Sequence, residues 1–264
     1  MESLQDLLGG EFYSILSSYP KFFSINHKKN FIYGYVKNGR IGYLGYHFYD
    51  DARIKEKLTT LGIKKLIEMD AKRIIIFASD PEIINLLSKL SFKHIRDLKL
   101  LCLKIRKEYV IESIKEKKNL AIKNIELRDI ITLKNFYDLS LPSELAHTIN
   151  ELEIWYKVNK KGFYGAYVNN KLVGAVFGHR GPGGRGWIRG LVVDPRWRLK
   201  NIGSNLLLVI VDYFKSIGIN EITALTFDEE VESNFYEKNG FTFKEIIKEF
   251  MFIKGSRFNK GAYK

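Results

Sequence analysis

The 264-residue chain has a single cysteine and no apolar run long enough to cross a bilayer. Cys102 cannot form a disulfide within the chain, and a lone cysteine fits a reducing compartment. It lies in the apolar stretch 98–105, where a free cysteine usually packs as a small hydrophobic side chain. The apolar run 206–211 ends at Asp212, far short of the roughly 20 residues that a membrane helix needs. We therefore expect a cytoplasmic protein with no disulfide and no membrane partner.

Positive charge is in excess. The chain has 43 Lys and Arg against 30 Asp and Glu, a net charge of +13. The basic residues are scattered, which is more typical of a solvated surface than of a groove for phosphates. Hydrophobic residues make up 45 %, enough to fill a globular core. We do not expect nucleic acid as the partner, although a nucleic-acid-associated protein stays an alternative.

An internal repeat is visible in two short stretches. Residues 35–42 align without gaps with residues 167–174, and the same offset places His47 opposite His179. Each stretch alternates apolar residues around a turn that contains Asn. This pattern predicts a β-hairpin in each half.

A second match follows further along each half. The apolar stretch 73–77 resembles 221–225, and Phe92 corresponds to Phe241 at a larger offset. The change of offset places 17 additional residues around 180–203 in the second half. The sequence thus predicts two related α/β units packed with pseudo-twofold symmetry, of which only the second has this insert.

The unit boundaries follow from this repeat. We expect a first unit at 1–105, a linker at 106–118, a second unit at 119–254 and a basic tail at 255–264. The second unit is predicted to contain strands at 120–126, 163–168, 172–179, 187–193, 221–226 and 241–253, and helices at 130–139, 143–159 (with Ser143 as N-cap), 204–217 and 230–238.

The segment 191–204 carries the clearest chemical signal. It joins an apolar strand, a break at Asp194-Pro195, a basic turn and the start of an apolar helix. A helix N-terminus offers unpaired N–H groups and a partial positive charge, which suit a phosphate. Gly203 would let a ligand approach the backbone, and Arg198 and Lys200 would add charge. These features predict an anion site; a basic loop that only starts a helix is the alternative.

This segment resembles the acetyl-coenzyme A motif of the GNAT (Gcn5-related N-acetyltransferase) superfamily, Arg/Gln-x-x-Gly-x-Gly/Ala after Val-x-Pro. In this chain it reads Arg198-x-x-Asn201-x-Gly203 after Val193-Asp194-Pro195. Asn201 replaces the first glycine, and Asn tolerates a left-handed backbone better than most residues. Residues 235–241, Phe-Tyr-Glu-Lys-Asn-Gly-Phe, are similar to a second family segment.

The resemblance covers about residues 119–254. It implies an α/β (α+β) fold of two GNAT-like units, each a mixed, mostly antiparallel sheet flanked by helices. It also implies acetyl-coenzyme A as the cofactor, with coenzyme A as a product.

Residue roles carry over by position. The pantetheine arm would pair with the backbone of Leu191, Val192 and Val193, where the strand would splay. The N–H of Val193 would polarise the thioester carbonyl. Tyr236 would protonate the departing thiolate, with a purely packing role as its alternative. The pyrophosphate would be bound by Arg198, Leu199, Lys200, Asn201, Ile202, Gly203 and Ser204.

The general base stays open. Many relatives carry a carboxylate on the strand before the loop, but 187–193 has Arg189 and no acidic residue. His179 is the best titratable candidate, because histidine titrates near neutrality. Its counterpart His47 in the first unit favours a shared structural role instead.

Other polar residues of the second unit are less informative. Glu144, His147 and Glu151 could line an acceptor groove, but we expect a solvated helix face for each. The Asn of the family near the start of the last helix would fall close to Glu229.

The first unit is expected to be a degenerate copy. It lacks the loop insert and has Leu87 where the second unit has Tyr236. We expect it to pack against the second unit and to shape the acceptor site. Its aromatic residues are expected to form core: Phe12, Tyr13, Tyr19, Phe22, Phe23, Phe31, Tyr33 and Tyr35.

The sequence thus predicts an enzyme that moves an acetyl group from acetyl-coenzyme A to a primary amine by direct attack, without a metal. A non-catalytic, acetyl-coenzyme A-binding regulatory module is the alternative. No motif indicates whether the acceptor is a small molecule or a protein, or what the oligomeric state is.

Overall fold

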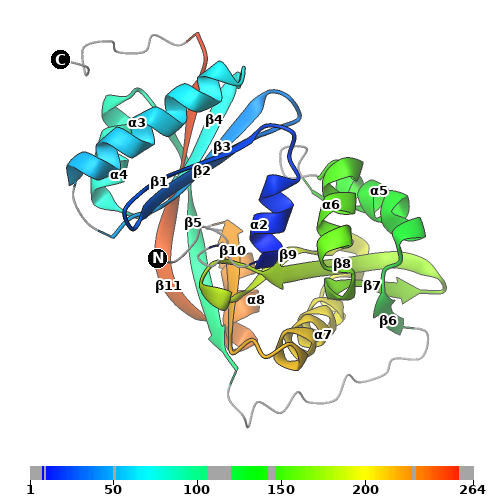
Figure 1. Cartoon of the computed structure of the whole chain (residues 1–264). Helices are drawn as coiled ribbons and strands as arrows, with labels where there is room; N and C mark the ends of the chain where they lie inside the picture. The colour runs from blue at the N-terminus through cyan, green and yellow to red at the C-terminus, as the bar shows by residue number, and fades with distance from the viewer. Residues whose placement is uncertain are drawn as a thin grey trace.

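The strands of the two halves form one sheet. The computed structural model describes residues 8, 10–49, 52–105, 120–141, 147–227 and 230–255. Over these residues the sheet has eleven strands in the order β1-β2-β3-β4-β11-β5-β10-β9-β8-β7-β6. The helices gather in two groups towards its two ends (Figure 1). The mixed α/β fold, with a mostly antiparallel sheet flanked by helices, confirms the expected class.

The first half contains helix α2 (Gly10–Ser17), strands β1 (Phe22–His27), β2 (Asn30–Lys37) and β3 (Ile41–His47), helix α3 (Ala52–Glu68), strand β4 (Arg73–Ala78), helix α4 (Pro81–Lys89) and strand β5 (Lys93–Lys104). Neighbours from β1 to β3 are antiparallel, and β3 and β4 are parallel with α3 as their crossover.

The second half contains strand β6 (Leu120–Asn124), helices α5 (Ile130–Ser140) and α6 (Ile149–Val158), strands β7 (Phe163–Val168), β8 (Lys171–Arg180) and β9 (Gly186–Val193), helix α7 (Ile202–Ser216), strand β10 (Glu221–Phe227), helix α8 (Glu230–Lys238) and strand β11 (Thr242–Ile253). Strands β9 and β10 are parallel with α7 as their crossover. No described helix is both long and apolar enough to cross a membrane.

Both predicted hairpins are present. Asn38 and Gly39 have φ of 51° and 64°, and Asn169 and Asn170 have φ of 48° and 63°. Two successive left-handed residues match the right-handed twist of the flanking strands, and Asn and Gly adopt that conformation at low cost. The turn residues alone were therefore enough to place β2–β3 and β7–β8.

The structural repeat differs from the predicted alignment by one strand. The parallel pair with a helical crossover is β3–β4 in the first half and β9–β10 in the second, so the hairpin β2–β3 corresponds to β8–β9 rather than to β7–β8. The sequence match followed shared turn chemistry, which any hairpin can have. The 17 additional residues predicted around 180–203 are therefore not a single insert. The connection before the crossover helix is only somewhat longer in the second half, at 194–201, than in the first, at 48–51.

The last strand of each half is inserted into the other half. Strand β11 lies between β4 and β5 and is antiparallel to both, and β5 also pairs with β10. The central order β4-β11-β5-β10 therefore has the pseudo-twofold arrangement that the repeat predicted. Figure 1 shows β5 and β11 running side by side between the two helix groups.

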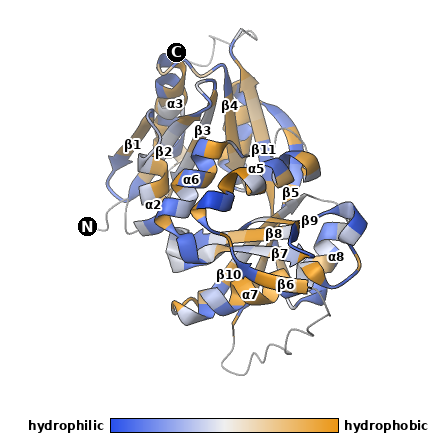
Figure 2. Ribbon diagram, turned by 90° about the vertical axis from the view of Figure 1, so that its right-hand side faces the viewer, coloured by the Kyte–Doolittle hydropathy of each residue, from blue (hydrophilic) through white to orange (hydrophobic). Residues whose placement is uncertain are grey.

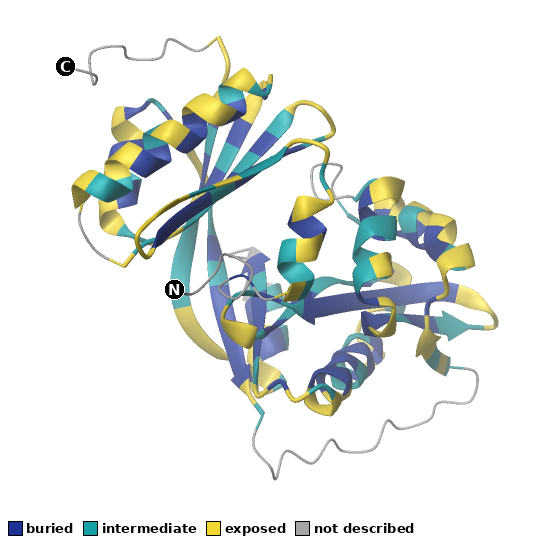
Figure 3. Ribbon diagram, in the orientation of Figure 1, coloured by how far each residue is buried: buried dark blue, intermediate teal, exposed yellow. Residues whose placement is uncertain are grey.

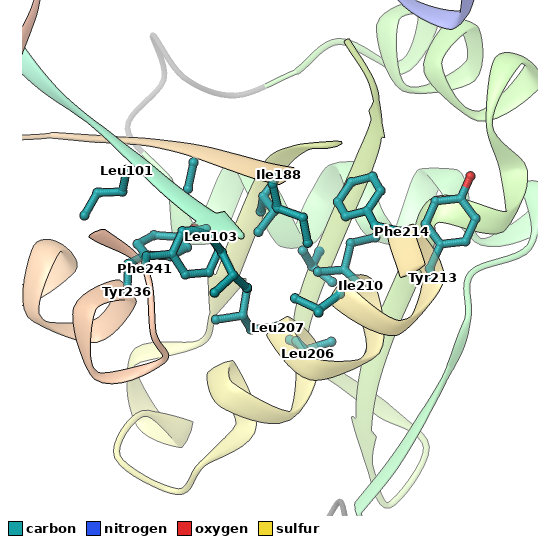
Figure 4. Close-up of a cluster of buried hydrophobic side chains, with 14 of the residues drawn as sticks. Leu101, Leu103, Ile188, Leu206, Leu207, Ile210, Tyr213, Phe214, Tyr236 and Phe241 are labelled. Carbon is teal, nitrogen blue, oxygen red and sulfur yellow. The ribbon is translucent and has the colours of Figure 1, made fainter. Parts of the chain in front are cut away.

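The exchange completes both hydrophobic cores. The core of the first half, which includes Ile74 and Ile76, contains Phe250 and Phe252 of β11. The core around α7 contains Leu101 and Leu103 of β5 (Figure 4). Hydrophobic residues follow the sheet strands in both halves (Figure 2), and β8 is buried along most of its length (Figure 3).

Helix α2 belongs to the first half in sequence but packs against the second. The ring of Phe12 stacks on that of His179 at 5.4 Å, and the carboxylate of Glu11 accepts the N–H of Arg180 at 2.8 Å. Figure 1 shows α2 between the strands of the first half and α6. Phe12 is thus an interface residue rather than part of a first-half core.

One predicted helix start is wrong. Helix α6 begins at Ile149, with Thr148 as N-cap in a capping box with Glu151, and not at Ser143. The Thr-x-x-Glu pattern provides both donor and acceptor for the first turn, which favours a start at this point. Ser143, Glu144, Glu229, the linker 106–118 and nearly all of the tail 255–264 lie outside the described residues.

Candidate functional site

Strand β9 diverges from β10 after its first residues. The two strands pair only at Gly186 and Trp187, whereas on its other side β9 pairs with β8 as far as Val193. The predicted splay is therefore present. It leaves the backbone of 191–193 without a paired strand on the β10 side among the described residues.

A β-bulge at Gly190 shapes this part of β9. Gly190 has φ of 56°, and its carbonyl accepts the hydroxyl of Tyr137 at 2.8 Å. A Cβ at this position would lie 2.7 Å from the Tyr137 oxygen and 2.8 Å from the ring of Phe177. Glycine is thus required here for both its conformation and its size.

The N–H of Val193 points to the open side of β9. The N–H of Asp194 bonds the carbonyl of Val173 at 2.9 Å, so it faces β8. Successive N–H groups along a strand point in opposite directions. The carbonyl of Val193 points in the same direction as the N–H of Val193. It accepts a hydrogen bond from Nε of Arg198 at 3.3 Å.

The turn after β9 is held by an ion pair. The Asp194 carboxylate accepts the backbone N–H of Arg196 at 3.0 Å and its guanidinium at 2.7 and 3.0 Å. These hydrogen bonds lower the pKa of Asp194 to about 2. Asp194 therefore keeps its charge and fixes the chain where it leaves the strand.

The turn also contains strained backbone. Leu199 is fully exposed with φ of 58°, and Asn201 has φ of 63°. A left-handed residue other than glycine costs roughly 1–2 kcal/mol, and such strain gathers at functional sites. Asn201 adopts the conformation that the glycine of the family motif would favour, as expected. Lys200 lies with its ammonium 4.5 Å from the Trp197 ring centroid.

Helix α7 begins directly after this turn. Its N-cap, Asn201, makes no side-chain hydrogen bond to the first turn, and Ile202 anchors the helix in the core. A Cβ at Gly203 would lie 3.2 Å from the ring of Phe235 in α8, so the N-terminus of α7 packs closely against that helix. The first N–H groups of a helix have no partner within it, and with Arg198 nearby they suit a phosphate.

Tyr236 lies in the core of the second half, 8 % exposed, close to Phe241 (Figure 4). The ring of Phe235 also contacts it, with the centroids 5.2 Å apart. Burial raises the pKa of Tyr236, and the charge of Glu232 adds to the effect. The phenol therefore stays protonated at neutral pH. The first half has Leu87 in the corresponding helix α4, where it is fully buried and apolar.

His179 is also buried, under Phe12 and Trp155. Burial lowers the pKa of His179 to about 3, and Arg189 contributes. Nδ1 lies 3.0 Å from the carbonyl of Arg180, which places the proton of the neutral ring on Nδ1 and leaves a lone pair on Nε2. His179 is paired with Trp187, four residues or about 13 Å of extended strand before Leu191.

Sequence reasoning missed a charged group between the halves. Glu151 is 4 % exposed and not on a solvated face; its carboxylate pairs with Lys37 of the first half at 3.1 Å and accepts the hydroxyl of Tyr19 at 3.2 Å. Burial alone would raise the pKa of Glu151, but Lys37 and the N–H of Thr148 hold it below its ordinary value. The capping box signalled that Glu151 is engaged, but nothing local signalled Lys37.

Comparison with known proteins gives one sequence match, in the second half. Residues 127–241 match the sequence model described as the Acetyltransferase (GNAT) family. No curated protein matches the chain in sequence. A tandem GNAT protein from the clavulanic acid biosynthesis pathway, solved without AcCoA, has 10 % identity and a TM-score of 0.70, over 94 % of this chain and 88 % of that chain.

Two other solved structures have the same fold. The GCN5-related N-acetyltransferase from Sphaerobacter thermophilus has 13 % identity and a TM-score of 0.66, over 85 % of this chain and 76 % of that chain. The corresponding protein from Kribbella flavida has 8 % identity and a TM-score of 0.66, over 92 % and 93 %. The sequence match at 127–241 is thus to the acetyltransferase (GNAT) family, and the likeness to these solved structures shows that the chain has their fold.

Proposed function

We propose that this protein transfers an acetyl group from acetyl-coenzyme A to a primary amine, by direct attack of the amine on the thioester. The observation that carries the proposal is the divergence of β9 from β10 beside a basic turn that opens helix α7. An open strand edge next to a helix N-terminus suits a ligand that has amide groups at one end and a pyrophosphate at the other.

Acetyl-coenzyme A would lie along this edge as a substrate. The backbone of Leu191, Val192 and Val193 would pair with the amides of its pantetheine arm. The pyrophosphate would accept N–H groups from the turn 198–204 and the charge of Arg198. The left-handed conformation of Leu199 and Asn201 supports this role, because turns that contain left-handed residues can direct successive N–H groups at an anion.

The chemical step needs three groups of the protein. As the amine nitrogen bonds to the carbonyl carbon, negative charge develops on the carbonyl oxygen, and the N–H of Val193 would stabilise it. When the carbon–sulfur bond breaks, the Tyr236 hydroxyl would give its proton to the departing thiolate.

The nitrogen must lose a proton in return. Nε2 of His179 has a free lone pair at neutral pH, but His179 is distant along the strand. The pKa of about 3 also makes His179 a weak base. The proton would therefore pass to solvent through intervening water, and the part proposed for His179 is to hold that water through Nε2.

Calorimetry of acetyl-coenzyme A binding tests the substrate site. The intact chain should bind it, and Gly203→Glu should abolish binding, since it places a carboxylate and a bulky side chain where the phosphate would lie. Ser216→Glu, at the opposite end of α7, is the matched control and should bind normally. If the intact chain does not bind acetyl-coenzyme A, the proposal is wrong.

Turnover with a library of amines tests the chemistry. Tyr236→Phe should lower kcat by roughly 10²–10⁴-fold with unchanged acetyl-coenzyme A affinity, since it removes only the proton donor. Tyr213→Phe removes another largely buried hydroxyl of the same core and should leave kcat near the wild-type value. Binding without turnover of any amine would instead favour the regulatory module.

A further inference from the structure

The two halves meet beside β9 in a group of aromatic and polar side chains. We call it the interface cluster; its members are Phe12, Trp155, His179, Trp187 and Arg189. They come from α2, α6, β8 and β9. The guanidinium carbon of Arg189 lies 5.9 Å from the ring centroid of Trp155 and 5.2 Å from that of Trp187.

Three buried nitrogens of this cluster have no hydrogen-bond partner among the described residues: Nε2 of His179, Nε1 of Trp187 and Nε of Arg189. His179 itself is only 1 % exposed. A buried polar atom without a partner destabilises the folded protein, and most buried polar atoms in native proteins have a hydrogen-bond partner. A group of unsatisfied nitrogens in one place therefore indicates a polar ligand.

The charge of Arg189 is not compensated within the described part of the chain. No carboxylate there lies within ion-pair distance, and the groups nearby are neutral: the phenols of Tyr35, Tyr33 and Tyr19 and the buried histidines. Glu151 is already engaged by Lys37. A largely buried cation without a counterion is costly, so its retention favours an anionic group on a ligand.

Arg189 is also close to the expected site of acetyl transfer. It precedes Leu191 by two residues, with the bulge at Gly190 between them. A small molecule could thus place one group at the guanidinium and another near the open edge of β9. A guanidinium can bind both oxygens of a carboxylate with its planar edge.

We propose that Arg189 binds a carboxylate of the acceptor, so that the amine acetylated by this protein belongs to an amino acid or a similar small carboxylated amine. The inference rests on the proposed function, because it names the acceptor class of the same site. The aromatic rings of Phe12 and Trp155 would contact the body of that molecule.

The test measures acetylation by the full chain with a panel of amino acids, each paired with the amine that lacks only its carboxylate. The amino acids should have a kcat/KM roughly 10–100-fold higher than their paired amines. Arg189→Gln should remove this preference through KM, with acetyl-coenzyme A affinity unchanged. Arg189→Lys should retain part of it, and Arg185→Gln, a control in the turn before β9, should retain all of it.

The outcomes separate this inference from the proposed function. Equal acetylation of acids and amines, or an equal loss for both in Arg189→Gln, would overturn the role of Arg189 and leave acetyl transfer standing. If acetyl-coenzyme A binds but no amine reacts, calorimetry should measure the binding of the amino acids to the wild type and to Arg189→Gln. Equal binding by the two proteins, or no binding, would reject the inference. Failure to bind acetyl-coenzyme A would reject both.

Discussion

Two histidines of the second half stay neutral in the folded protein at mildly acidic pH. His179 and His147 both lie near Arg189, and burial lowers the pKa of His179 to about 3 and that of His147 to about 4. Both rings are therefore neutral in the folded protein at pH values where an unfolded chain would protonate them. They make the stability of the protein depend on pH.

Acidification should destabilise the protein before its carboxylates titrate. Below the ordinary histidine pKa of about 6.5, the unfolded state binds a proton that the folded state does not bind. The free energy of unfolding therefore falls as the pH falls. Between pH 7 and pH 5, His179 alone should cost about 2 kcal/mol of unfolding free energy. Urea unfolding at pH 7 and at pH 5 should show a smaller loss of unfolding free energy for His179→Phe than for the wild type. The exposed control His27→Phe should lose as much stability as the wild type. An equal loss in His179→Phe would contradict the lowered pKa of His179.

At the scale of elements, the exchanged strands have the largest consequence. Strand β11 follows the second half in sequence but supplies side chains to the core of the first, where the ring of Phe252 lies 5.4 Å from that of Phe92. The stability of the first half therefore depends on the last strand of the chain.

Truncation of one side chain on β11 tests this dependence. Phe252 is 2 % exposed, so Phe252→Ala should lower the unfolding free energy by about 3–5 kcal/mol. Phe243, on the same strand, is 52 % exposed, and Phe243→Ala should change it by only about 0.5 kcal/mol. Denaturant unfolding of the two variants measures both values; similar losses would mean that β11 does not complete the first core.

At the scale of the whole molecule, the halves are interdependent. Without the first half, β10 would lose its partner β5, and β11 would lose both of its neighbours. The core around α7 would also lose Leu101 and Leu103. The first half, in turn, contributes Lys37 and Phe12 to the surroundings of the site.

The second half expressed alone, residues 119–264, should therefore not fold cooperatively. We expect no sharp thermal transition by circular dichroism and no acetyl-coenzyme A binding. Co-expression with residues 1–118 should restore a complex that purifies together. A cooperative, ligand-binding fragment would show that the exchanged strand is dispensable.

Local sequence was sufficient for much of the second half. The pattern around Asp194-Pro195 and Gly203 correctly predicted a strand, a turn and a helix, because break residues and apolar periodicity act over a few positions. Asn in the hairpin turns likewise identified both hairpins. Tyr236 stays a predicted proton donor, since its burial fits that role and a packing role equally.

Only the tertiary structure decided which strands are neighbours and which charges meet. The exchange of β5 and β11, the ion pair of Glu151 with Lys37 and the contact of Arg189 with Trp155 all join residues far apart in the chain. The periodicity of a strand specifies which of its faces is buried, but not which other strand lies beside it. That choice depends on the fit of whole surfaces. The sequence by itself therefore determined the two hairpins and most elements of the second half, but not the order of the strands across the two halves.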